Sequence, residues 1–351
     1  MTEEQRALQE AVRSLLERHA GSAAVRAAVD QPRGFDEKLW HLLCDQIGVA
    51  GLGIPEAYGG AGASLVETAL VLEELGRVLA PAPLLGSAVL AGQAVLATGD
   101  ADACARLLPA IADGTRIAAL AWSDASGHWH PDRPAATAAE GPDGWRLDGD
   151  AHFVLDGDIA DVLLVATGDG LFEVDPDAAR REPTPAMDLT RRLARVTLEA
   201  APARPLGRTD LALVRDIGCA ALAAEQAGAA ARALDLTVAY AKTREQFGQP
   251  IGAFQALKHR MAEMYVQVES ARAIAYAAAA APSELGAVAK VHCSEAFQQV
   301  TAEMIQLHGG IAITWEHDAH LYFKRAHGSA QLFGQPGEYV SRLTATALTA
   351  H

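Results

Sequence analysis

The sequence predicts an α + β protein in which a β-rich segment lies between two helical regions. Apolar residues recur at helical spacing in the first third of the chain and again in its last part, as expected for amphipathic helices. From about Arg116 the pattern changes to short β-rich runs separated by Gly, Asp and Pro, which is typical of a compact antiparallel β-unit. We therefore place an N-terminal helical domain at 1–114, a middle antiparallel β-domain at 115–204 and a C-terminal helical bundle at 205–351.

Capping signals locate the helices of the N-terminal domain. Thr2 followed by Gln5, and Ser64 followed by Glu67, have the spacing of a capping box, in which two side chains satisfy free N–H groups at a helix start. Apolar residues at helical spacing follow both pairs. We interpret Phe35-Asp36 as the start of another helix between them.

The C-terminal region is predicted to contain long helices. We interpret Arg204 to Gly207 as the linker that leaves the β-domain. An Ala-rich helix is expected from Leu211 to Thr243 and a second helix from Gln255 to about Ala281. Ser283 is the expected N-cap of a third helix, which ends at His308 before two glycines. The many small residues of these helices are interpreted as positions of tight helix packing.

Composition and charge exclude several classes of function. Hydrophobic residues make up 50% of the 351 residues, so the chain can bury a large core and disorder is not expected. A net charge of −15 excludes nucleic acid as a partner, because phosphate binding requires concentrated Lys and Arg. The N-terminus lacks a secretory signal, and charged residues and prolines interrupt the apolar stretches. We therefore expect no membrane span and a cytoplasmic protein.

The cysteines and histidines do not predict a metal site. The four cysteines stand far apart without a CxxC pair, so we expect reduced, buried thiols. Histidines gather in Gly127–Asp132 and in Glu316–His320, but neither stretch contains a complete ligand set. Surface histidines are the preferred interpretation, and no metal is expected.

Two segments at helix ends carry groups suited to an anionic or aromatic ligand. Thr243 to Ile251 contains an Arg, which binds an anionic oxygen bidentately, and a Phe, which can cover an aromatic ring. Gln306 to Gly310 offers an amide side chain beside bare glycine backbone, which a phosphate can approach closely. Taken alone, each segment is more often a helix stop than a ligand site.

Together, these segments resemble the C-terminal signature of the acyl-CoA dehydrogenases. The resemblance lies in AYAKTREQFGQPIGAFQALKHRMAEM and in IQLHGGIAIT. In addition, GLGIPEAYGGAG resembles the PEEYGGxG loop of that family, and HFVLDGDIADVLLVAT resembles the core of its β-domain. The resemblance covers nearly the whole chain. It implies the family's fold, with an N-terminal helical domain, a middle antiparallel β-domain and a C-terminal four-helix bundle.

The resemblance also implies that the chain contacts FAD at a subunit interface. In this family the isoalloxazine and the substrate sit in one subunit, whereas the C-terminal helices of the neighbour hold the ADP half of the cofactor. Matched position by position, the contacts to a neighbour's flavin would be Arg244, Gln246, Phe247, Ile251, Phe254, Leu257, Gln306, Leu307 and Gly310.

The base that a member of the family needs for its own chemistry is missing. The reaction removes an α-proton and a β-hydride from an acyl-CoA thioester, with a desolvated Glu as the base. The resemblance places this Glu at Gly334 or, in some members, at Gly218, so both base positions are empty. Asp216 and Glu338 lie nearby but are displaced, and two residues turn Asp216 about 200° around a helix. A surface role is the preferred interpretation for both.

The flavin-facing part of the β-domain also departs from the family. Ala121 to Gly127 replaces the TEPxAGSD stretch, and Phe153-Val154-Leu155 replaces the W-x-T motif, so polar partners of the ring system are lost. The parts that serve the chain's own active site are degraded, whereas the parts that serve a neighbour's flavin are intact. We therefore expect the non-catalytic subunit of a heterodimeric or heterotetrameric acyl-CoA dehydrogenase, whose partner subunit carries the Glu.

Such heteromers are a feature of actinobacterial members that act on steroid side-chain CoA thioesters. The Ala- and Arg-rich helix that contains AAEQAG resembles that subgroup, which implies a bulky acyl-CoA substrate. The vacated cleft could then leave room for a polycyclic acyl group. The family also implies an electron-transfer flavoprotein as the electron acceptor.

Alternative interpretations remain open. A self-sufficient homo-oligomeric dehydrogenase could use Asp216 or Glu338 as an atypical base. A non-catalytic scaffold could keep the fold and bind no flavin, although the retained Arg244 counts against it. A flavin oxidase or monooxygenase of the same fold would need different residues near the flavin.

Overall fold

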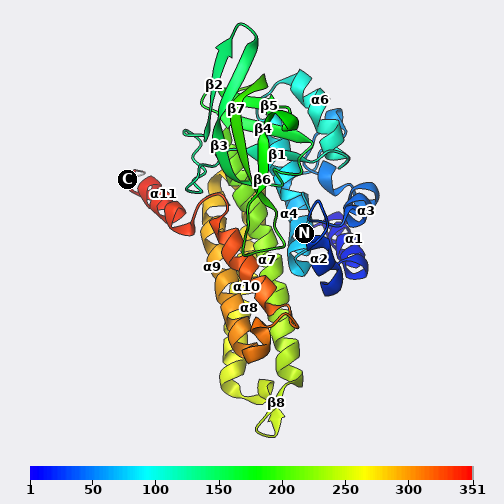
Figure 1. Ribbon diagram of the computed structural model, residues 1–351. Helices are drawn as coiled ribbons and strands as arrows, with labels where there is room; N and C mark the ends of the chain where they lie inside the picture. Colours follow the sequence, from blue (N-terminus) through cyan, green and yellow to red (C-terminus); the bar gives the residue numbers. More distant parts are fainter. Residues whose placement is uncertain (350–351) are drawn as a thin grey trace.

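The computed structural model describes residues 1–349, including the side chains of residues 1–345. A helical bundle forms the long axis of the molecule, and a β-domain covers one end of it (Figure 1). The N-terminal helices pack beside the bundle, next to the β-domain. This arrangement confirms the predicted class of N-terminal helices, middle β-domain and C-terminal bundle.

The N-terminal domain is helical throughout. Its elements are α1 (Glu3–His19), α2 (Ser22–Val29), α3 (Glu37–Ile47), η1 (Val49–Gly51), η2 (Glu56–Tyr58), α4 (Leu65–Val78), the π-helical η3 (Leu85–Ala91), α5 (Gly92–Leu96) and α6 (Ala101–Ala112). Thr2 with Gln5 and Ser64 with Glu67 form the predicted capping boxes of α1 and α4. Asp36 caps α3 by accepting two backbone N–H groups, as predicted. Helix α2 and the π-helix were not predicted.

The β-domain is a closed barrel. Its strands are β1 (Ala118–Ala121), β2 (Ala136–Gly141), β3 (Gly144–Leu155), β4 (Val162–Thr167), β5 (Gly170–Val174), β6 (Arg180–Pro183) and β7 (Leu193–Gly207), with a short η4 (Pro176–Ala178). They follow the order β1-β4-β2-β3-β7-β5, and β5 pairs again with β4, which closes the sheet. Most pairings are antiparallel, as predicted. However, β1 and β2 both pair with β4 in parallel, which the prediction of an antiparallel unit did not include.

Residues Arg204 to Gly207 belong to strand β7, so the prediction of a linker there was wrong. Arg204 pairs with Glu173 of β5, and Gly207 pairs with Leu171. Pro and Gly usually mark a loop, but here a register shift beside Leu171 accommodates them within the barrel. The domain limits drawn at residues 114 and 204 stay a prediction.

Long helices build the C-terminal bundle. They are α7 (Leu211–Thr243), α8 (Gln255–Ala280), α9 (Pro282–His308), α10 (Ala319–Gln331) and α11 (Pro336–Thr349), joined in part by β8 (Glu245–Gln246), β9 (Gln249–Pro250), η5 (Ile251–Ala253) and η6 (Gly309–Ile313). The bounds of α7 and the end of α9 at His308 are as predicted. Ser283 does not cap α9, because the helix already begins at Pro282, and proline is favoured at a first helical position.

Glycines allow α4 and α7 to cross with their backbones in contact. A Cβ atom on Gly228 would lie 1.9 Å from the carbonyl oxygen of Glu73, and a Cβ on Gly76 would lie 2.1 Å from that of Glu225. Only glycine fits such approaches, so tight packing explains these small residues, as the sequence predicted. This contact fixes the N-terminal domain against the bundle.

The apolar core consists of three clusters. One is shared by the N-terminal domain and the part of the bundle near the β-domain, the second lies in the part of the bundle away from the β-domain, and the third lies inside the barrel. All four cysteines are buried and unpaired, as predicted. Among the described residues, no helix combines the length and apolar character that crossing a bilayer requires.

Candidate functional site

The predicted cofactor contacts gather at the end of the bundle that lies away from the β-domain. The β8–β9 hairpin projects from this end (Figure 1). Arg244 follows α7 and Phe247 lies at the hairpin tip with a left-handed φ of 54°. The Phe247 side chain is 92% exposed. Arg244 is exposed as well, and no carboxylate of the described residues pairs with it. The hairpin therefore presents an unpaired cation beside an exposed ring.

The second motif reaches the same end of the bundle. The ring of His308 in α9 stacks on that of Tyr240 in α7, with centroids 4.4 Å apart, and Tyr240 accepts the backbone N–H of Arg244. Gln306 is exposed at the end of α9, and a Cβ on Gly310 would meet no atom within 4 Å. The structure thus places both motifs on one end of the bundle.

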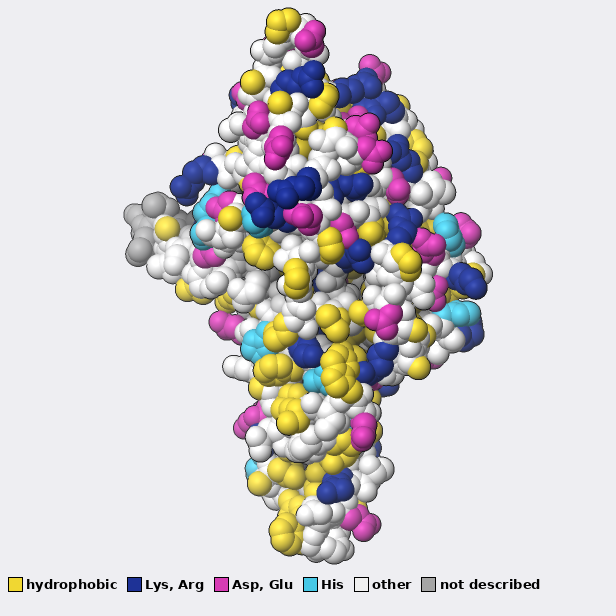
Figure 2. Space-filling view, viewed as in Figure 1, with side chains coloured by type: hydrophobic (Ala, Val, Ile, Leu, Met, Phe, Trp, Pro, Cys, Tyr) yellow, Lys and Arg dark blue, Asp and Glu magenta, His cyan; other side chains and the backbone are white. Residues whose placement is uncertain are grey.

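The nine predicted contacts differ in burial. Ile251 and Leu307 are buried and contribute to packing within the chain, whereas Phe254 and Leu257 are half-buried. Arg244, Gln246, Phe247, Gln306 and Gly310 are exposed. Hydrophobic side chains gather over the lower, bundle part of the surface in Figure 2. The exposed apolar residues of the lower bundle include Phe247, Tyr265, Val266, Ile313 and Trp315.

The two positions expected for a base lie near the other end of the bundle, and the space beside Gly218 is filled. A Cβ on Gly218 of α7 would lie 2.8 Å from Leu90 and 3.2 Å from the ring of Phe333. Leu90 and Phe333 are both buried. The expectation that a vacated cleft leaves room for a polycyclic acyl group is therefore wrong at this position, because buried apolar side chains occupy it.

An aromatic cluster continues this packing into the β-domain. The ring of Trp129 lies 5.1 Å from that of Phe333 and 5.6 Å from that of Trp122, edge to face in both cases. All three side chains are buried. We call Leu90, Trp122, Trp129 and Phe333 the apolar plug. Its aromatic members connect the segment between β1 and β2, which we call the β-domain loop, to the turn between α10 and α11.

The turn that carries the second base position is fixed by polar contacts. Phe333 and Gly334 have left-handed φ values of 64° and 104°. The Tyr339 hydroxyl donates to the Phe333 carbonyl at 2.6 Å and lies 3.2 Å from Cys219 Sγ. Burial raises the pKa values of both the Cys219 thiol and the Tyr339 hydroxyl. Both groups are therefore neutral at physiological pH and serve to hold the turn.

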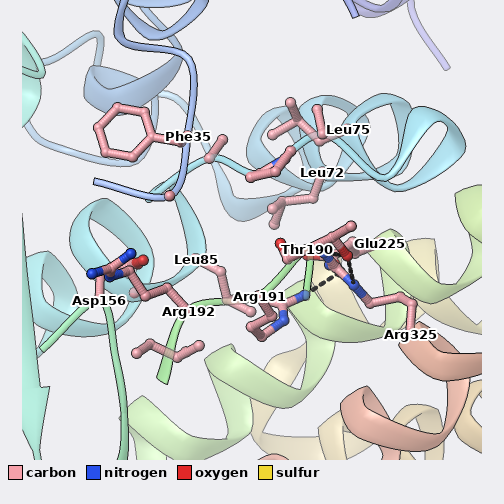
Figure 3. Close-up of a pocket in the computed structure, with 16 residues that line it drawn as sticks. Phe35, Leu72, Leu75, Leu85, Asp156, Thr190, Arg191, Arg192, Glu225 and Arg325 are labelled. Carbon is pink, nitrogen blue, oxygen red and sulfur yellow. Dashed lines mark hydrogen bonds and ion pairs between the residues drawn. The ribbon is translucent and has the colours of Figure 1, made fainter. Parts of the chain in front are cut away.

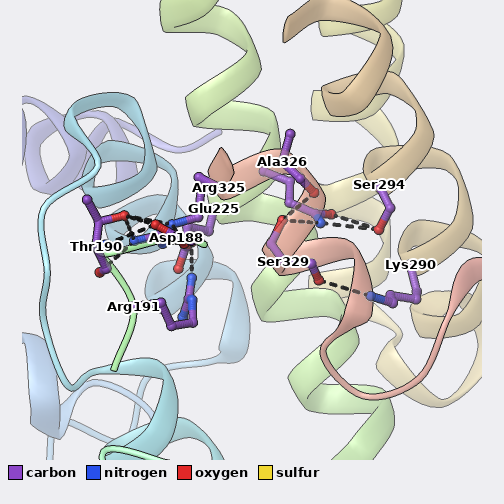
Figure 4. Close-up of polar contacts among 10 residues, drawn as sticks. Asp188, Thr190, Arg191, Glu225, Lys290, Ser294, Arg325, Ala326 and Ser329 are labelled. Atoms are coloured by element: carbon purple, nitrogen blue, oxygen red, sulfur yellow. Dashed lines mark hydrogen bonds and ion pairs between the residues drawn. The ribbon is translucent and has the colours of Figure 1, made fainter. Parts of the chain in front are cut away.

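A buried lysine fastens the end of α10 beside this turn. Lys290 is fully buried, and its Nζ donates to the Ser329 carbonyl at 3.2 Å (Figure 4). It also donates to the Ala330 carbonyl at 2.9 Å. Burial lowers the pKa of Lys290 to about 8. The interaction places a cation at the C-terminal end of α10, where helix carbonyls are otherwise unpaired.

The two substitute bases have different surroundings. Asp216 is buried and pairs with Arg215 at 3.3 Å and Arg342 at 3.2 Å, so the predicted surface role for Asp216 was wrong. Glu338 is exposed, as predicted, and accepts the backbone N–H of Gln335 at 3.1 Å.

Glu338 lines a cavity of about 230 Å³ between the β-domain loop and the α10–α11 turn. Ser126, Phe153 and Leu332 also line it. Ligand pockets usually measure about 300–1,000 Å³. The cavity is therefore small for a flavin ring with an acyl thioester beside it.

The polar groups of the β-domain loop form hydrogen bonds within the β-domain. Ser123 is buried and its hydroxyl donates to the carbonyl of His152. Asp124 accepts the backbone N–H groups of Ser126 at 2.8 Å and His128 at 3.0 Å. Phe153 stands in the left-handed region with φ 54°, against Gly127. This part of the chain offers few free polar groups to a ring system.

The histidine-rich stretches are less exposed than predicted. His320 is buried, and His128, His130 and His317 are half-buried, so the surface interpretation was wrong for His320. Within residues 1–349, no group of three potential ligands has a geometry that would hold a metal ion.

Comparisons with known proteins identify the family of the chain. Profiles for the acyl-CoA dehydrogenase N-terminal and C-terminal domains match residues 2–115 and 216–336. Acyl-CoA dehydrogenase IpdE2 of Mycolicibacterium smegmatis is 46% identical over 98% of this chain and 99% of the relative. The chain belongs to the acyl-CoA dehydrogenase family.

As an acyl-CoA dehydrogenase, the chain also resembles solved heteromeric members. IpdE2 of Mycobacterium tuberculosis is 49% identical over 97% of this chain and 96% of the relative. A variant of the Tcur3481-Tcur3483 steroid ACAD superposes with a TM-score of 0.90 at 34% identity, over 99% of this chain and 98% of that one. The ChsE4-ChsE5 complex of Mycobacterium tuberculosis superposes with a TM-score of 0.89 at 27% identity, over the same shares. Acyl-CoA dehydrogenases are FAD-dependent oxidoreductases that act on CH–CH bonds.

Sequence reasoning missed the apolar plug of this acyl-CoA dehydrogenase. Trp129 stands inside a stretch that was considered only for its histidines, and Leu90 lies in the unpredicted π-helix. A tryptophan in a Gly- and Pro-containing loop was the one available signal, because such a side chain is rarely left fully exposed.

Proposed function

We propose that this chain is the non-catalytic subunit of a hetero-oligomeric acyl-CoA dehydrogenase that forms an α,β-double bond in an acyl-CoA thioester. The partner subunit would carry the Glu and the isoalloxazine pocket, and this chain would contact the ADP half of the FAD. One observation carries the proposal. Both base positions are glycines, and the apolar plug leaves no room for a side chain at Gly218.

The end of the bundle fits an anionic, aromatic group. Arg244 would bind a pyrophosphate oxygen, because its exposed guanidinium lacks an ion-pair partner among the described residues. The exposed ring of Phe247 would cover an aromatic ring, and the open backbone at Gly310 would allow close approach. Bound FAD supplies a hydride acceptor for the β-carbon. The remaining predicted contacts are Gln246, Ile251, Phe254, Leu257, Gln306 and Leu307.

The second base position also supports the proposal that the partner subunit carries the catalytic base. Gly334 has φ 104°, which a residue with a side chain adopts only under strain. A Cβ there would also lie 3.2 Å from the Glu338 carboxylate. A Glu at either position would therefore need the surrounding turn or helix to repack. Catalysis would depend on the carboxylate of the partner subunit.

The similarity to a protein named a steroid ACAD and to IpdE2 supports a bulky acyl-CoA as the substrate of the complex. Transfer of the electrons to an electron-transfer flavoprotein would complete turnover. A second candidate function rests on Glu338. Because this exposed carboxylate lines the cavity beside the β-domain loop, a self-sufficient enzyme would use Glu338 rather than the ion-paired Asp216 as its base.

The absorption spectrum of the purified protein tests the proposal. We expect flavin absorbance only when the chain is co-expressed with a catalytic acyl-CoA dehydrogenase subunit. In that complex, Arg244→Met should weaken FAD retention about 10- to 100-fold, because a hydrogen bond to a charged group contributes about 1.5–3 kcal/mol. Arg208→Met is the matched control, since Arg208 is an exposed arginine that precedes the other end of α7, and it should leave retention unchanged.

Flavin bound to the chain alone would refute the proposal. If the chain alone retains stoichiometric FAD that bleaches on adding an acyl-CoA, the subunit proposal is wrong. Glu338→Gln should then abolish bleaching, whereas Asp216→Asn should not.

A further inference from the structure

An uncharged cavity of about 300 Å³ lies where the N-terminal helices meet the bundle. Segments around η1, α4 and η3 line it from the N-terminal domain, and α7 with the turn between α8 and α9 lines it from the bundle. Apart from Ser64, Thr68 and Gln93, the lining residues of the described chain are apolar or glycine, and none is charged. Ligand pockets usually measure about 300–1,000 Å³. The cavity is therefore large enough for a small, neutral ligand.

The cavity is open to solvent at one side and buried at the other. Ser64 and Ala280 are exposed, and they mark the opening between the start of α4 and the end of α8. Val49, Leu84 and Ala88 are buried and line the inner part. A ligand can therefore enter from solvent while the N-terminal domain stays packed on the bundle.

The π-helix η3 separates this cavity from the apolar plug. Ala88 lines the cavity, whereas Leu90 packs against Gly218. Because two residues turn about halfway around a helix, the two side chains leave opposite faces of η3. Leu85 borders a different cavity of about 30 Å³ that charged residues such as Asp156 line (Figure 3). The uncharged cavity is therefore separate from the base positions, and π-helices are frequent at functional sites.

The Thr68 hydroxyl in α4 is buried without a hydrogen-bond partner. Thr68 is 4% exposed, and its Oγ1 makes no hydrogen bond among the described residues. Thr237 and Thr301 are also buried in helices, and each donates to the carbonyl four residues earlier, at 2.7 and 2.9 Å. Thr68 Oγ1 is not one of the unpaired atoms that are shut off from solvent. Its accessible surface therefore lies in the cavity that Thr68 lines.

Gln93 places an acceptor near this hydroxyl. Its Nε2 donates to the Gly53 carbonyl at 3.0 Å, which fixes the carboxamide. Its Oε1 has no hydrogen-bond partner within the part of the chain that the structure describes. A Cβ on Gly53 would lie 3.5 Å from Gln93 Nε2 and 3.6 Å from Thr68 Oγ1, so both polar groups flank the same glycine. A single ligand can therefore meet both groups.

We propose that this cavity binds a neutral aliphatic alcohol of about 8–12 carbon atoms. An apolar cavity of about 150 Å³ holds one benzene ring, so twice that volume holds about 12 carbon atoms. The ligand hydroxyl accepts from Thr68 Oγ1 and donates to Gln93 Oε1, and the hydrocarbon part contacts apolar residues such as Leu84 and Ala88. A carboxylate is excluded because no cation lines the cavity. The site uses neither the predicted flavin contacts nor the base positions, so it is independent of the proposed subunit role.

Isothermal titration calorimetry of the full-length chain with 1-octanol tests the site. We expect saturable binding of one equivalent, and no binding of octanoate at the same concentrations. Thr68→Val should weaken the binding of 1-octanol about 3- to 10-fold, as expected for one neutral hydrogen bond. It should keep the Tm of the wild-type chain, because no bond within the chain is lost. Thr237→Val is the matched control, since that hydroxyl is buried but bonded within its helix, and it should leave the affinity unchanged.

Ala88→Leu fills the cavity and keeps the proposal testable if Thr68→Val does not fold. It should abolish the binding of 1-octanol and raise the Tm of the free chain. Binding that is unchanged in both variants would overturn the proposal, because the alcohol would then bind elsewhere. Absence of binding by the wild-type chain up to the solubility limit of 1-octanol would refute it as well. If octanoyl-CoA displaces 1-octanol, the cavity belongs to an acyl-CoA site and the proposal is wrong.

Discussion

Gly218 offers the sharpest test of the packing that fills the base position. Alanine at an open helical position stabilises by about 1 kcal/mol relative to glycine. At Gly218, however, the added methyl would lie 2.8 Å from Leu90 and 3.2 Å from the ring of Phe333. Phe333 cannot yield freely, because Trp129 packs against it. Overpacking costs about 1–3 kcal/mol, so we expect Gly218→Ala to destabilise the chain by about 1 kcal/mol net.

Gly337→Ala is the matched control for this substitution. Gly337 is also helical, in α11, but a Cβ there would meet no atom within 4 Å. It should be neutral or stabilising by up to about 1 kcal/mol. Urea unfolding followed by far-UV circular dichroism measures both variants by linear extrapolation. If Gly218→Ala gains as much stability as Gly337→Ala, the space beside Gly218 is open and the reasoning about the plug fails.

A double variant isolates the contact itself. Leu90→Ala alone should cost about 2–5 kcal/mol, as other large-to-small core substitutions do. Added to Gly218→Ala, it makes room for the new methyl group, so the double variant should lose less than the sum of the two single effects. Additive effects would place the clash elsewhere. By the same geometry, Gly218→Glu should fail to restore a base, since its carboxylate has no space beside Leu90 and Phe333.

Two further substitutions test buried charges. Arg325→Met should destabilise the chain by about 3–5 kcal/mol in urea unfolding, because it leaves Asp188 and Glu225 buried without their shared cation. Arg180→Met is the control. It breaks an exposed pair with Glu182 and should cost less than about 1 kcal/mol. Burial lowers the pKa of Lys290 to about 8, so the unfolded chain binds this proton more tightly and stability should rise with pH between about 8 and 10. Lys290→Met should abolish that rise, and an unchanged pH profile would contradict it.

Local chemistry explains what the sequence predicted correctly. Capping boxes depend on residues three apart, so Thr2 with Gln5 and Ser64 with Glu67 identified two helix starts. The two glycines that begin η6 likewise end α9 at His308. The change from helical to β-rich spacing and back gave the order of the domains, and the resemblance to the acyl-CoA dehydrogenases agreed with that order.

Long-range contacts explain what it could not predict. The parallel pairing of β1 with β4 joins residues far apart in the chain. Pro205 appeared to end the β-domain, but a register shift in the partner strand accommodates it. The burial of Asp216 and of His320 depends on which helix faces them, and neither residue carries a local signal of its partners.

The apolar plug also depends on long-range contacts, and it is the feature that bears most directly on function. A working active site keeps a cavity and a desolvated carboxylate, and both lower stability. In this chain, the equivalent space beside Gly218 holds Leu90 and Phe333, and burying one such side chain contributes about 1.5–3 kcal/mol. Phe333 also stands at φ 64°, in a strained region that its packing must offset. A site that had merely lost its base would leave a cavity. The filled space beside Gly218, together with the exposed groups at the other end of the bundle, is consistent with the proposal that this chain is a non-catalytic subunit.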